Sequence, residues 1–408
     1  MTVSKALLGD VADFYAGASL KAGEVWANQK GGYLLTRVSD MNRAGNERCI
    51  QSAQHWSATP GQKSATCPGG AVVFPKRGGA IGTNKKRILR RAAVLDPNLM
   101  AVKPREEVLD LDYLHQWFRT IDLRRLANGS SVPQLNKKDL TPLLIPLPQL
   151  AEQRRIAAVL DQVDILRVKR REAISLFDDL AQSIFFDMFG DPIVNSRNWD
   201  RVKMRDFLVD IEGGKSPQCL DRQAEGDEWG VLKLGAVTRC VYLQNENKAL
   251  PSGVLPDTRK EVKAGDLLFT RKNTPDLVAA SAYVRSTRSR LLMPDLVFRL
   301  VVAGNASVDK VYLHALLTYP GKRRKLQKLA SGSAASMVNI SKSKLMDFVC
   351  EVPPLALQQK FAQRIEGLEV EKDVHRAHLA ILDELFTSLQ RRAFSGTLWD
   401  HVATGDAA

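Results

Sequence analysis

One helical stretch occurs twice in this chain, and that repeat constrains the fold more than any other feature. One copy begins at Pro148 and the other at Pro353, and they align without a gap at an offset of 205 residues. In each copy a proline leads into a run whose apolar residues recur about every 3.5 residues, which is typical of a long helix that packs on another helix. Two such helices in one chain are expected to pair with each other. A long insert separates them, so chain length alone leaves the direction open, and an antiparallel pair would relate the two halves by an approximate two-fold axis.

The apolar stripes of the two copies supply the candidate coiled-coil and partner-docking residues. They are Ile156, Leu160, Val163, Phe177, Ile184, Phe185 and Phe189 in the first copy, and Phe361, Ile365, Leu368, Leu382, Leu389 and Phe394 in the second. The aromatic residues near the helix ends exceed what one partner helix needs. They either pack on their own globular segments or form a docking surface for a helix of another protein.

Polar residues interrupt both stripes near their middles, at Arg167 and Arg170 in the first copy and at Lys372 and His375 in the second. Such residues are either solvated and paired with nearby acids, or they fix the helix register, as a polar core position does in coiled coils.

The repeat extends into the globular segments. The tripeptide Tyr113–His115 returns at Tyr312–His314, and the segment that starts at Gly70 resembles the one that starts at Gly265. The sequence therefore predicts an α+β fold, in which two mixed α/β domains are separated by two long helices packed as an antiparallel coiled coil with pseudo-two-fold symmetry. The expected boundaries are 1–147 for the first domain, 148–191 for the central helix, 192–352 for the second domain, 353–398 for the C-terminal helix and 399–408 for a tail. Within the domains we expect strands at 72–74, 143–147, 267–269 and 348–352, and helices near 111–126 and 310–329.

The net charge of +14 is concentrated in the globular segments. Residues 1–150 carry 21 basic and 12 acidic groups, and residues 191–355 carry 26 and 18, whereas both helical segments are slightly acidic. This separation indicates a polyanion bound at two places. The five cysteines form no CxxC motif, and the chain has neither a signal-peptide pattern nor an apolar run near the ~20 residues that cross a bilayer. We therefore expect a cytoplasmic protein with reduced thiols and no metal site.

Three basic clusters are the candidate DNA-binding residues. They are Lys76, Arg77, Lys85, Lys86 and Arg87 in the first domain, Arg271, Lys272 and Asn273 in the equivalent loop of the second, and Lys322, Arg323 and Arg324 near a helix end. Small-residue loops at 129–131 and 332–336 follow the basic helices. Arginine and asparagine can read bases in a major groove, while lysine mostly meets phosphates. The alternative for any one of these residues is a solvated surface cation.

Motifs for catalysis are incomplete. The segment Gly213–Ser216 resembles the end of a P-loop, but Val209 stands where the first glycine is needed. Asp257 and Glu261 carry letters of a nuclease signature with too short a spacing to flank a metal. We find no amino-methyltransferase motif and no glycine-rich cofactor loop. His115 and His314 lie in expected helices as packing or capping residues.

Three stretches resemble the specificity subunit of type I restriction-modification systems. They are "PLPQLAEQRRI" from Pro146, "FFDMFGDP" from Phe185 and "SLQRRAFSGTL" from Ser388. The two-unit layout also matches along nearly the whole chain. The second copy departs from the pattern, because Leu357 and Phe361 stand where the first copy has Glu152 and Ile156.

The resemblance implies that each domain is a target-recognition domain that reads one half of a split double-stranded DNA site, with the coiled coil as spacer. It further implies that two methyltransferase subunits dock on the chain, that two motor-endonuclease subunits join the restriction complex, and that this subunit has no catalysis or cofactor of its own. A helix of 39 residues, from Glu152 to Gly190, is about 58 Å long and would separate domain centres by on the order of seventeen base pairs. The alternatives are a DNA methyltransferase or nuclease with unrecognised motifs, and a basic coiled-coil scaffold.

Overall fold

The computed structural model describes residues 4–19, 25–27, 31–129, 132–332 and 337–398, so the expected tail 399–408 and most of the loops at 129–131 and 332–336 lie outside the described residues. The chain forms two compact units. Unit 1 comprises residues 1–171 and 377–408, and unit 2 comprises residues 172–376. Each unit therefore contains one globular domain and one half of each long helix, which are α5 (Leu150–Phe189) and α10 (Leu355–Ser395).

Short strands and helices build the globular domain of unit 1. The strands are β1 (Lys5–Leu7), β2 (Ala12–Ala16), β3 (Val25–Ala27), β4 (Tyr33–Thr36), β5 (His55–Ser57), β6 (Thr66–Cys67), β7 (Ala71–Pro75), β8 (Arg87–Leu89), β9 (Ala93–Leu95), β10 (Leu99–Pro104) and β11 (Leu144–Pro146). The helices are α1 (Leu8–Val11), α2 (Leu111–Thr120), α3 (Leu123–Leu126) and α4 (Lys137–Leu140), with 3-10 turns η1 (Val38–Asn42) and η2 (Gly78–Thr83).

The globular domain of unit 2 is built in the same way. Its strands are β12 (Asp200–Lys203), β13 (Leu208–Gly213), β14 (Gly230–Leu232), β15 (Asn247–Ala249), β16 (Leu267–Thr270), β17 (Lys272–Asn273), β18 (Ser281–Tyr283), β19 (Leu291–Leu292), β20 (Val297–Val302), β21 (Val338–Asn339) and β22 (Val349–Val352). Its helices are α6 (Gly235–Thr238), α7 (Lys310–Thr318), α8 (Pro320–Gln327) and α9 (Lys342–Met346), with 3-10 turns η3 (Met204–Asp206) and η4 (Thr258–Lys260).

The two domains repeat one sheet topology. The central antiparallel sheet has the order β2-β10-β7-β8 in unit 1 and β13-β20-β16-β18 in unit 2. In each unit the first strand pairs with the strand that leads into a long helix, β1 with β11 and β12 with β22. The remaining sheets differ, because unit 1 has a five-stranded sheet β3-β5-β4-β9-β6 and unit 2 has the three-stranded sheet β15-β14-β19. The internal repeat of the sequence is thus a repeat of the fold, in which the outer sheets differ between the copies and unit 2 also has the two-stranded sheet β17-β21.

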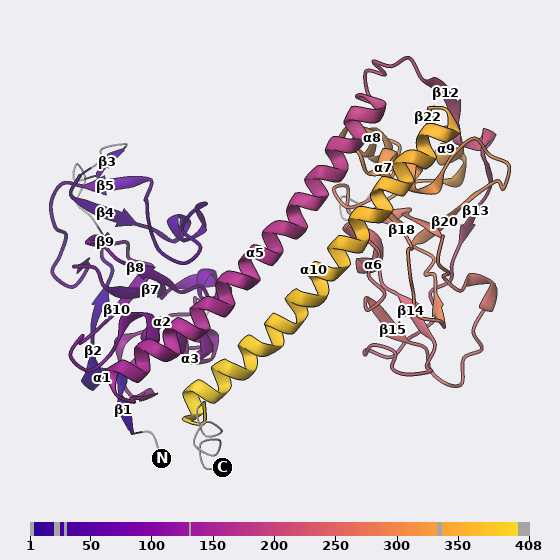
Figure 1. Cartoon of the computed structure of the whole chain (residues 1–408). Coiled ribbons are helices and arrows are strands. Elements are labelled where there is room, and N and C mark those ends of the chain that lie inside the picture. The colour runs from indigo at the N-terminus through magenta and orange to yellow at the C-terminus, as the bar shows by residue number, and fades with distance from the viewer. Residues whose placement is uncertain (1–3, 20–24, 28–30, 130–131, 333–336, 399–408) are drawn as a thin grey trace, which may run out of the picture. The chain divides into compact units, whose positions relative to one another are not determined.

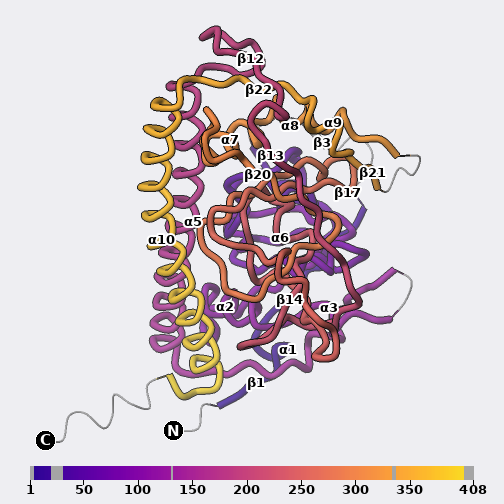
Figure 2. The backbone as a smooth tube through the Cα atoms, turned by 90° about the vertical axis from the view of Figure 1, so that its right-hand side faces the viewer, coloured from indigo at the N-terminus to yellow at the C-terminus, as the bar shows by residue number. Residues whose placement is uncertain are grey.

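Within each unit α5 and α10 run antiparallel, side by side (Figures 1 and 2). In unit 2, Phe177 meets the ring of His375, while Phe185, two turns further along α5, meets Phe361, which lies earlier in α10. In unit 1, Arg167 of α5 bonds Asp383 of α10. The apolar faces of both helices join the core of the globular domain, so each half-pair of helices is part of a unit's core. The predicted fold class, with two mixed α/β domains and two long antiparallel helices, is confirmed.

Two expected helices are each broken into two. The helix expected near 111–126 ends at Thr120 and resumes as α3, whose N-cap Asp122 accepts a hydrogen bond from the backbone of Arg124. The helix expected near 310–329 breaks at Tyr319, because Pro320 has no N–H to continue α7 and instead begins α8. The expected strands are present as β7, β11, β16 and β22, with ends that differ by at most one residue.

Candidate nucleic-acid and partner interface

A basic dipeptide follows the same strand in both domains. Lys76 and Arg77 come directly after β7, and Arg271 and Lys272 come directly after β16. In unit 1, Arg77 pairs with Gln134 in an isolated bridge, and in unit 2, Lys272 pairs with Asn339 in the short ladder of β17 and β21. Gln134 and Asn339 are themselves 205 residues apart. The fold therefore presents two cations on a matching segment of each unit.

The four side chains of these dipeptides differ in exposure. Arg77 is exposed and Lys272 is half-buried. Lys76 donates to the Gly17 carbonyl at 3.2 Å, and burial lowers the pKa of its ammonium. Arg271 donates to Asn339 at 3.2 Å and its guanidinium lies 5.0 Å from the centre of the Phe298 ring. Arg77 and Lys272 are thus the members most open to a ligand, while Lys76 and Arg271 are tied to the domain.

The structure uses Lys86 and Lys322 internally. Lys86 is 5% exposed and donates to the Ile121 carbonyl at 2.6 Å and to Asn84 at 2.8 Å, and burial lowers its pKa to about 8. Lys322 is 2% exposed and forms an ion pair with Glu351. A buried ammonium with protein partners cannot approach a phosphate without losing those bonds. Their burial therefore argues against the predicted DNA-binding role of these two lysines.

The other candidate DNA-binding residues differ in exposure and in their bonds to the protein. Lys85 bonds Asn42, and Arg87 is half-buried with a pKa lowered by burial. Asn273 is buried and its amide donates to Thr238 at 3.4 Å. Arg323 donates to the carbonyls of Asp276 and Leu277, whereas Arg324 beside it is exposed.

The candidate coiled-coil residues lie in the cores of the two units. Unit 1 buries Ile156, Leu160 and Val163, with Leu382, Leu389 and Phe394 packed against them. Unit 2 buries Phe185, Phe189, Phe361 and Ile365, with Ile184 and Leu368 packed against them, and Phe177 meets the ring of His375 edge-to-face. The end aromatics Phe185, Phe189 and Phe394 thus contact their own units, which is the first of the two alternatives.

The helices keep other apolar side chains exposed, and three of them on each helix repeat at the same offset. Ile165, Leu176 and Leu180 on α5 match Val370, Ile381 and Leu385 on α10, and all six are more than a third exposed. Unit 1 holds Ile165, Ile381 and Leu385, and unit 2 holds Val370, Leu176 and Leu180, so each unit shows one copy of the set. In each unit one member comes from one long helix and two come from the other, and those two are four residues apart and so lie on one face of their helix. We call these two sets the matched apolar patches. The sequence did not distinguish these residues from the coiled-coil residues, because an apolar residue next to the helix–helix contact has the same spacing as one within it.

The polar residues in the middle of the helices form matched ion triads. In unit 1, Arg167 bonds Asp164 on its own helix at 2.8 Å and Asp383 on α10 at 2.5 Å. In unit 2, Lys372 bonds Glu369 on its own helix at 2.8 Å and Asp178 on α5 at 2.6 Å. Each member of one triad lies 205 residues from its equivalent. The cations therefore bridge the helices and are not merely solvated.

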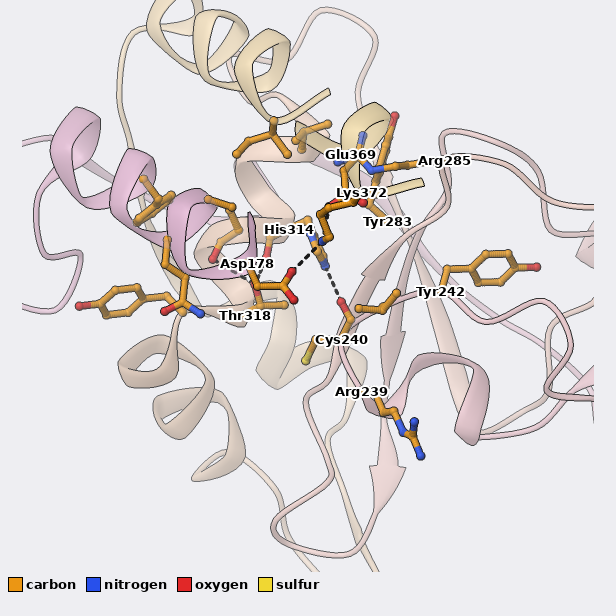
Figure 3. A pocket seen from close by; sticks show the side chains of 18 of the residues that line it. Asp178, Arg239, Cys240, Tyr242, Tyr283, Arg285, His314, Thr318, Glu369 and Lys372 are labelled. Atoms are coloured by element: carbon orange, nitrogen blue, oxygen red, sulfur yellow. Dashed lines mark hydrogen bonds and ion pairs between the residues drawn. The ribbon is translucent and has the colours of Figure 1, made fainter. Parts of the chain in front are cut away.

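Unit 2 contains a cavity of about 540 Å³ between its globular domain and the helices (Figure 3). Phe185 and Phe361 form part of its lining, together with the small residues Ala181, Ala315 and Thr318. Inside it, His314 faces the carbonyls of Cys240 and Ser281 at 3.2 and 3.1 Å. Burial lowers the pKa of His314, so this histidine is a neutral packing residue.

The motif fragments have structural partners. Lys215 pairs with Asp257 at 3.2 Å, and Glu261 accepts from the backbone of Arg290 at 2.6 Å. Among the described residues no three His, Cys, Asp or Glu side chains gather as a metal-binding group, and no helix is long and apolar enough to cross a membrane.

Comparison with known proteins agrees with this architecture. The profile of the type I restriction modification DNA specificity domain matches residues 3–175. The EcoEI specificity subunit of Escherichia coli is 32% identical over 169 residues, which are 41% of this chain and 28% of that protein. The EcoKI specificity subunit of E. coli K12 is 23% identical over 292 residues, which are 67% of this chain and 61% of that protein. The matched regions thus span less than two thirds of these relatives.

A solved structure shows the same fold along nearly the whole chain. The type I restriction-modification S subunit from M. genitalium has a TM-score of 0.60 at 13% identity and covers 96% of both chains. The fold therefore defines a class of protein in which two duplicated α/β domains are joined by a pair of long helices. Residues 3–175 thus resemble the type I restriction modification DNA specificity domain, and the fold of the chain is that of a type I S subunit.

Proposed function

We propose that this chain is the sequence-specific DNA-binding subunit of a type I restriction-modification complex, in which each globular domain reads one half of a bipartite site. The observation that carries the proposal is the repeated basic dipeptide, which places Arg77 and Lys272 on equivalent segments of two domains of one family fold. Equivalent cations on two readers suit the phosphates of one duplex, because a phosphate contact fixes position without reading sequence.

The long helices are the proposed spacer. α5 spans 40 residues, which is about 60 Å at 1.5 Å per residue. Each domain is anchored to both helices through its own core, and we propose that the helix length sets the gap between the half-sites. Removing or adding one heptad in both helices is expected to change the gap and leave the half-sites unchanged.

The matched apolar patches are the proposed docking surfaces for methyltransferase subunits. Each unit exposes one copy of the patch, so two identical partner helices would find two equivalent surfaces. Exposed apolar side chains contributed by both long helices of a unit suit the apolar face of an amphipathic helix of a partner. The two equivalent surfaces support the proposal that two methyltransferase subunits bind each chain, and two motor-endonuclease subunits would join them in the restricting complex.

The subunit itself is proposed to be a non-catalytic cytoplasmic protein without a cofactor. Its P-loop-like and nuclease-like fragments are occupied by internal ion pairs and backbone bonds, as described above. Methyl transfer and cleavage would then reside in the partner subunits.

Sequencing of methylated bases in cells that carry the chain with its methyltransferase tests the proposal. The expected result is one asymmetric split motif with a single gap. A second arm measures DNA binding by the purified chain at several salt concentrations, where log K should fall steeply with log salt. Methylation or cleavage by the purified chain alone would favour a catalytic protein, and salt-insensitive or absent DNA binding would favour a scaffold.

A further inference from the structure

Each long helix begins with a fully buried glutamine. Gln153 in α5 is 0% exposed, and all the polar groups of its amide point at backbone. Its Oε1 accepts from the N–H of Asp110 at 2.8 Å, and its Nε2 donates to the carbonyls of Val108 at 2.9 Å and Pro148 at 2.8 Å. One side chain thus joins the first turn of the helix to the proline linker and to the globular domain.

The same connection is present in unit 2. Gln358 is also 0% exposed and lies 205 residues after Gln153. It accepts from the N–H of Asp309 at 2.9 Å and donates to the carbonyls of Ser307 at 2.9 Å and Pro353 at 2.7 Å. We call each glutamine with its three backbone partners a glutamine joint.

Both joints contact the start of the main helix of their domain. Asp110 is the N-cap of α2 and Asp309 is the N-cap of α7. Each joint therefore bonds the first turn of a long helix to the residue that begins α2 or α7, and this bond constrains the angle at which the domain meets the helices.

Unit 1 has further bonds between α2 and the long helices. Gln116 donates to Asp161 of α5 at 2.6 Å, and Arg119 pairs with Asp164 at 2.9 Å. The guanidinium of Arg119 also lies 4.8 Å from the centre of the Phe386 ring of α10. These side chains fill the space between the domain and the helix pair.

Unit 2 lacks all three of these side chains, and its cavity lies where they would be. The α7 residues that match Gln116 and Arg119 are Ala315 and Thr318, and the α5 residue that matches Phe386 is Ala181. All three line the cavity, and so does Glu369, the equivalent of Asp164 (Figure 3). The ion pair of Arg285 with Glu366 remains beside it.

We propose that Gln153 and Gln358 are positioning residues that fix the orientation of each domain on its helices, and that unit 2 depends on its glutamine joint more than unit 1 does. Unit 1 keeps its orientation through Gln116, Arg119 and Phe386 when the joint is lost, whereas unit 2 has a cavity at that place. This inference deepens the proposed function, because the orientation of the domains sets how strictly the gap between half-sites is held.

A distance measurement without DNA tests the joints directly. Spin labels on a ketone-bearing amino acid, which leaves the native cysteines in place, are introduced in the full chain at exposed Leu255 and Val370 for unit 2, and at Thr83 and Ile165 for unit 1. Gln358→Ala should broaden the distance distribution in unit 2. Gln153→Ala should broaden the distribution in unit 1 by less. Unbroadened distributions in both variants would overturn the proposal.

Matched variants separate orientation from folding. Gln359→Ala removes the adjacent exposed glutamine and should leave the distribution unchanged. Gln358→Met keeps the side-chain volume without the amide and is the milder variant if the alanine form does not fold. Adding Ala315→Gln and Thr318→Arg to the variant places the unit 1 side chains in the cavity and should narrow the distribution again. Equal breadth with and without this addition would refute the dependence on the cavity.

Selection from a duplex library with random half-sites and gaps adds the functional readout. The wild-type chain should select one gap, and Gln358→Ala should select neighbouring gaps with the same half-sites. A uniform loss of affinity with an unchanged gap would show a purely structural glutamine and overturn the proposal. If the wild-type chain selects no bipartite site, the proposed function fails, and the spin-label distances still decide the inference.

Discussion

The buried ion pair of Lys322 and Glu351 allows the correction to the DNA-binding residues to be tested quantitatively. The two side chains are 3% and 4% exposed, and Lys322 also donates to the Val349 carbonyl at 3.1 Å. Lys322→Met removes the ammonium and leaves a buried carboxylate whose remaining cation is Arg201 at 3.6 Å. Breaking a buried ion pair from one side costs about 3–5 kcal/mol. Because Arg201 stays, we expect the free energy of unfolding of unit 2 to fall by about 3 kcal/mol, the lower end of that range.

Urea denaturation combined with hydrogen exchange measures this change, since exchange assigns the loss to amides of unit 2 in a chain with two compact units. The double variant Lys322→Met with Glu351→Met should recover most of the loss, because an apolar pair replaces the buried charges. Arg324→Met is the matched control on the same helix, since Arg324 is exposed. It should leave stability within about 0.5 kcal/mol of wild type.

If Lys322 is structural, its replacement should lower stability but leave the contacts with DNA unchanged. The folded Lys322→Met protein should bind DNA with the wild-type salt dependence. A Lys322→Met protein of wild-type stability that has lost a unit of salt slope would refute the reasoning, because it would show that the ammonium leaves Glu351 to meet a phosphate.

Four further outcomes follow from the described contacts. Arg77→Ala and Lys272→Ala should each lower the slope of log K against log salt by about 0.9, measured by fluorescence anisotropy, and together by about twice that. The difference in free energy of unfolding between wild type and Lys86→Met should shift in favour of wild type by roughly 3 kcal/mol between pH 8 and 10.5. Burial lowers the pKa of Lys86 to about 8, so in this window the unfolded wild-type chain binds a proton that the folded chain lacks, and wild-type stability rises with pH. Leu176→Lys in unit 2 should halve the number of methyltransferase subunits bound in native mass spectra without changing thermal unfolding. Ile381→Lys should do the same in unit 1, and the two changes together should abolish binding.

The helices and their pairing were predictable because their signal is local and periodic. An apolar residue every three or four positions and a proline at the entry are properties of one segment. The duplication then predicted the second domain from the first, and the shared sheet topology confirms that prediction. The single helix expected near 310–329 is broken at Pro320. The sequence contains the signal for this break, since a proline inside an expected helix indicates a boundary.

The burial of individual cations could not be predicted from sequence. Lys322 and Arg324 are two residues apart in one basic run, yet one is ion-paired in the core and the other is exposed. The difference depends on Glu351, which lies in β22. No local sequence pattern predicts its ion pair with Lys322. The ion triads were easier to predict from sequence, because Asp164, Arg167 and Asp383 each have an equivalent of the same charge 205 residues away.

The comparison of the two copies separates what holds the domains from what distinguishes them. The glutamine joints, the ion triads and the strands that lead into the helices are the same in both units, whereas the outer sheets differ in strand number and order. A common frame with two different outer sheets is what a bipartite, asymmetric target requires, because equal readers would select equal half-sites. The matched cations Arg77 and Lys272 then suit phosphates, and base recognition is expected from segments without a counterpart, such as the β3-β5-β4-β9-β6 sheet of unit 1. Exchanging that sheet's loops should therefore change one half-site and leave both the other half-site and the gap as they are.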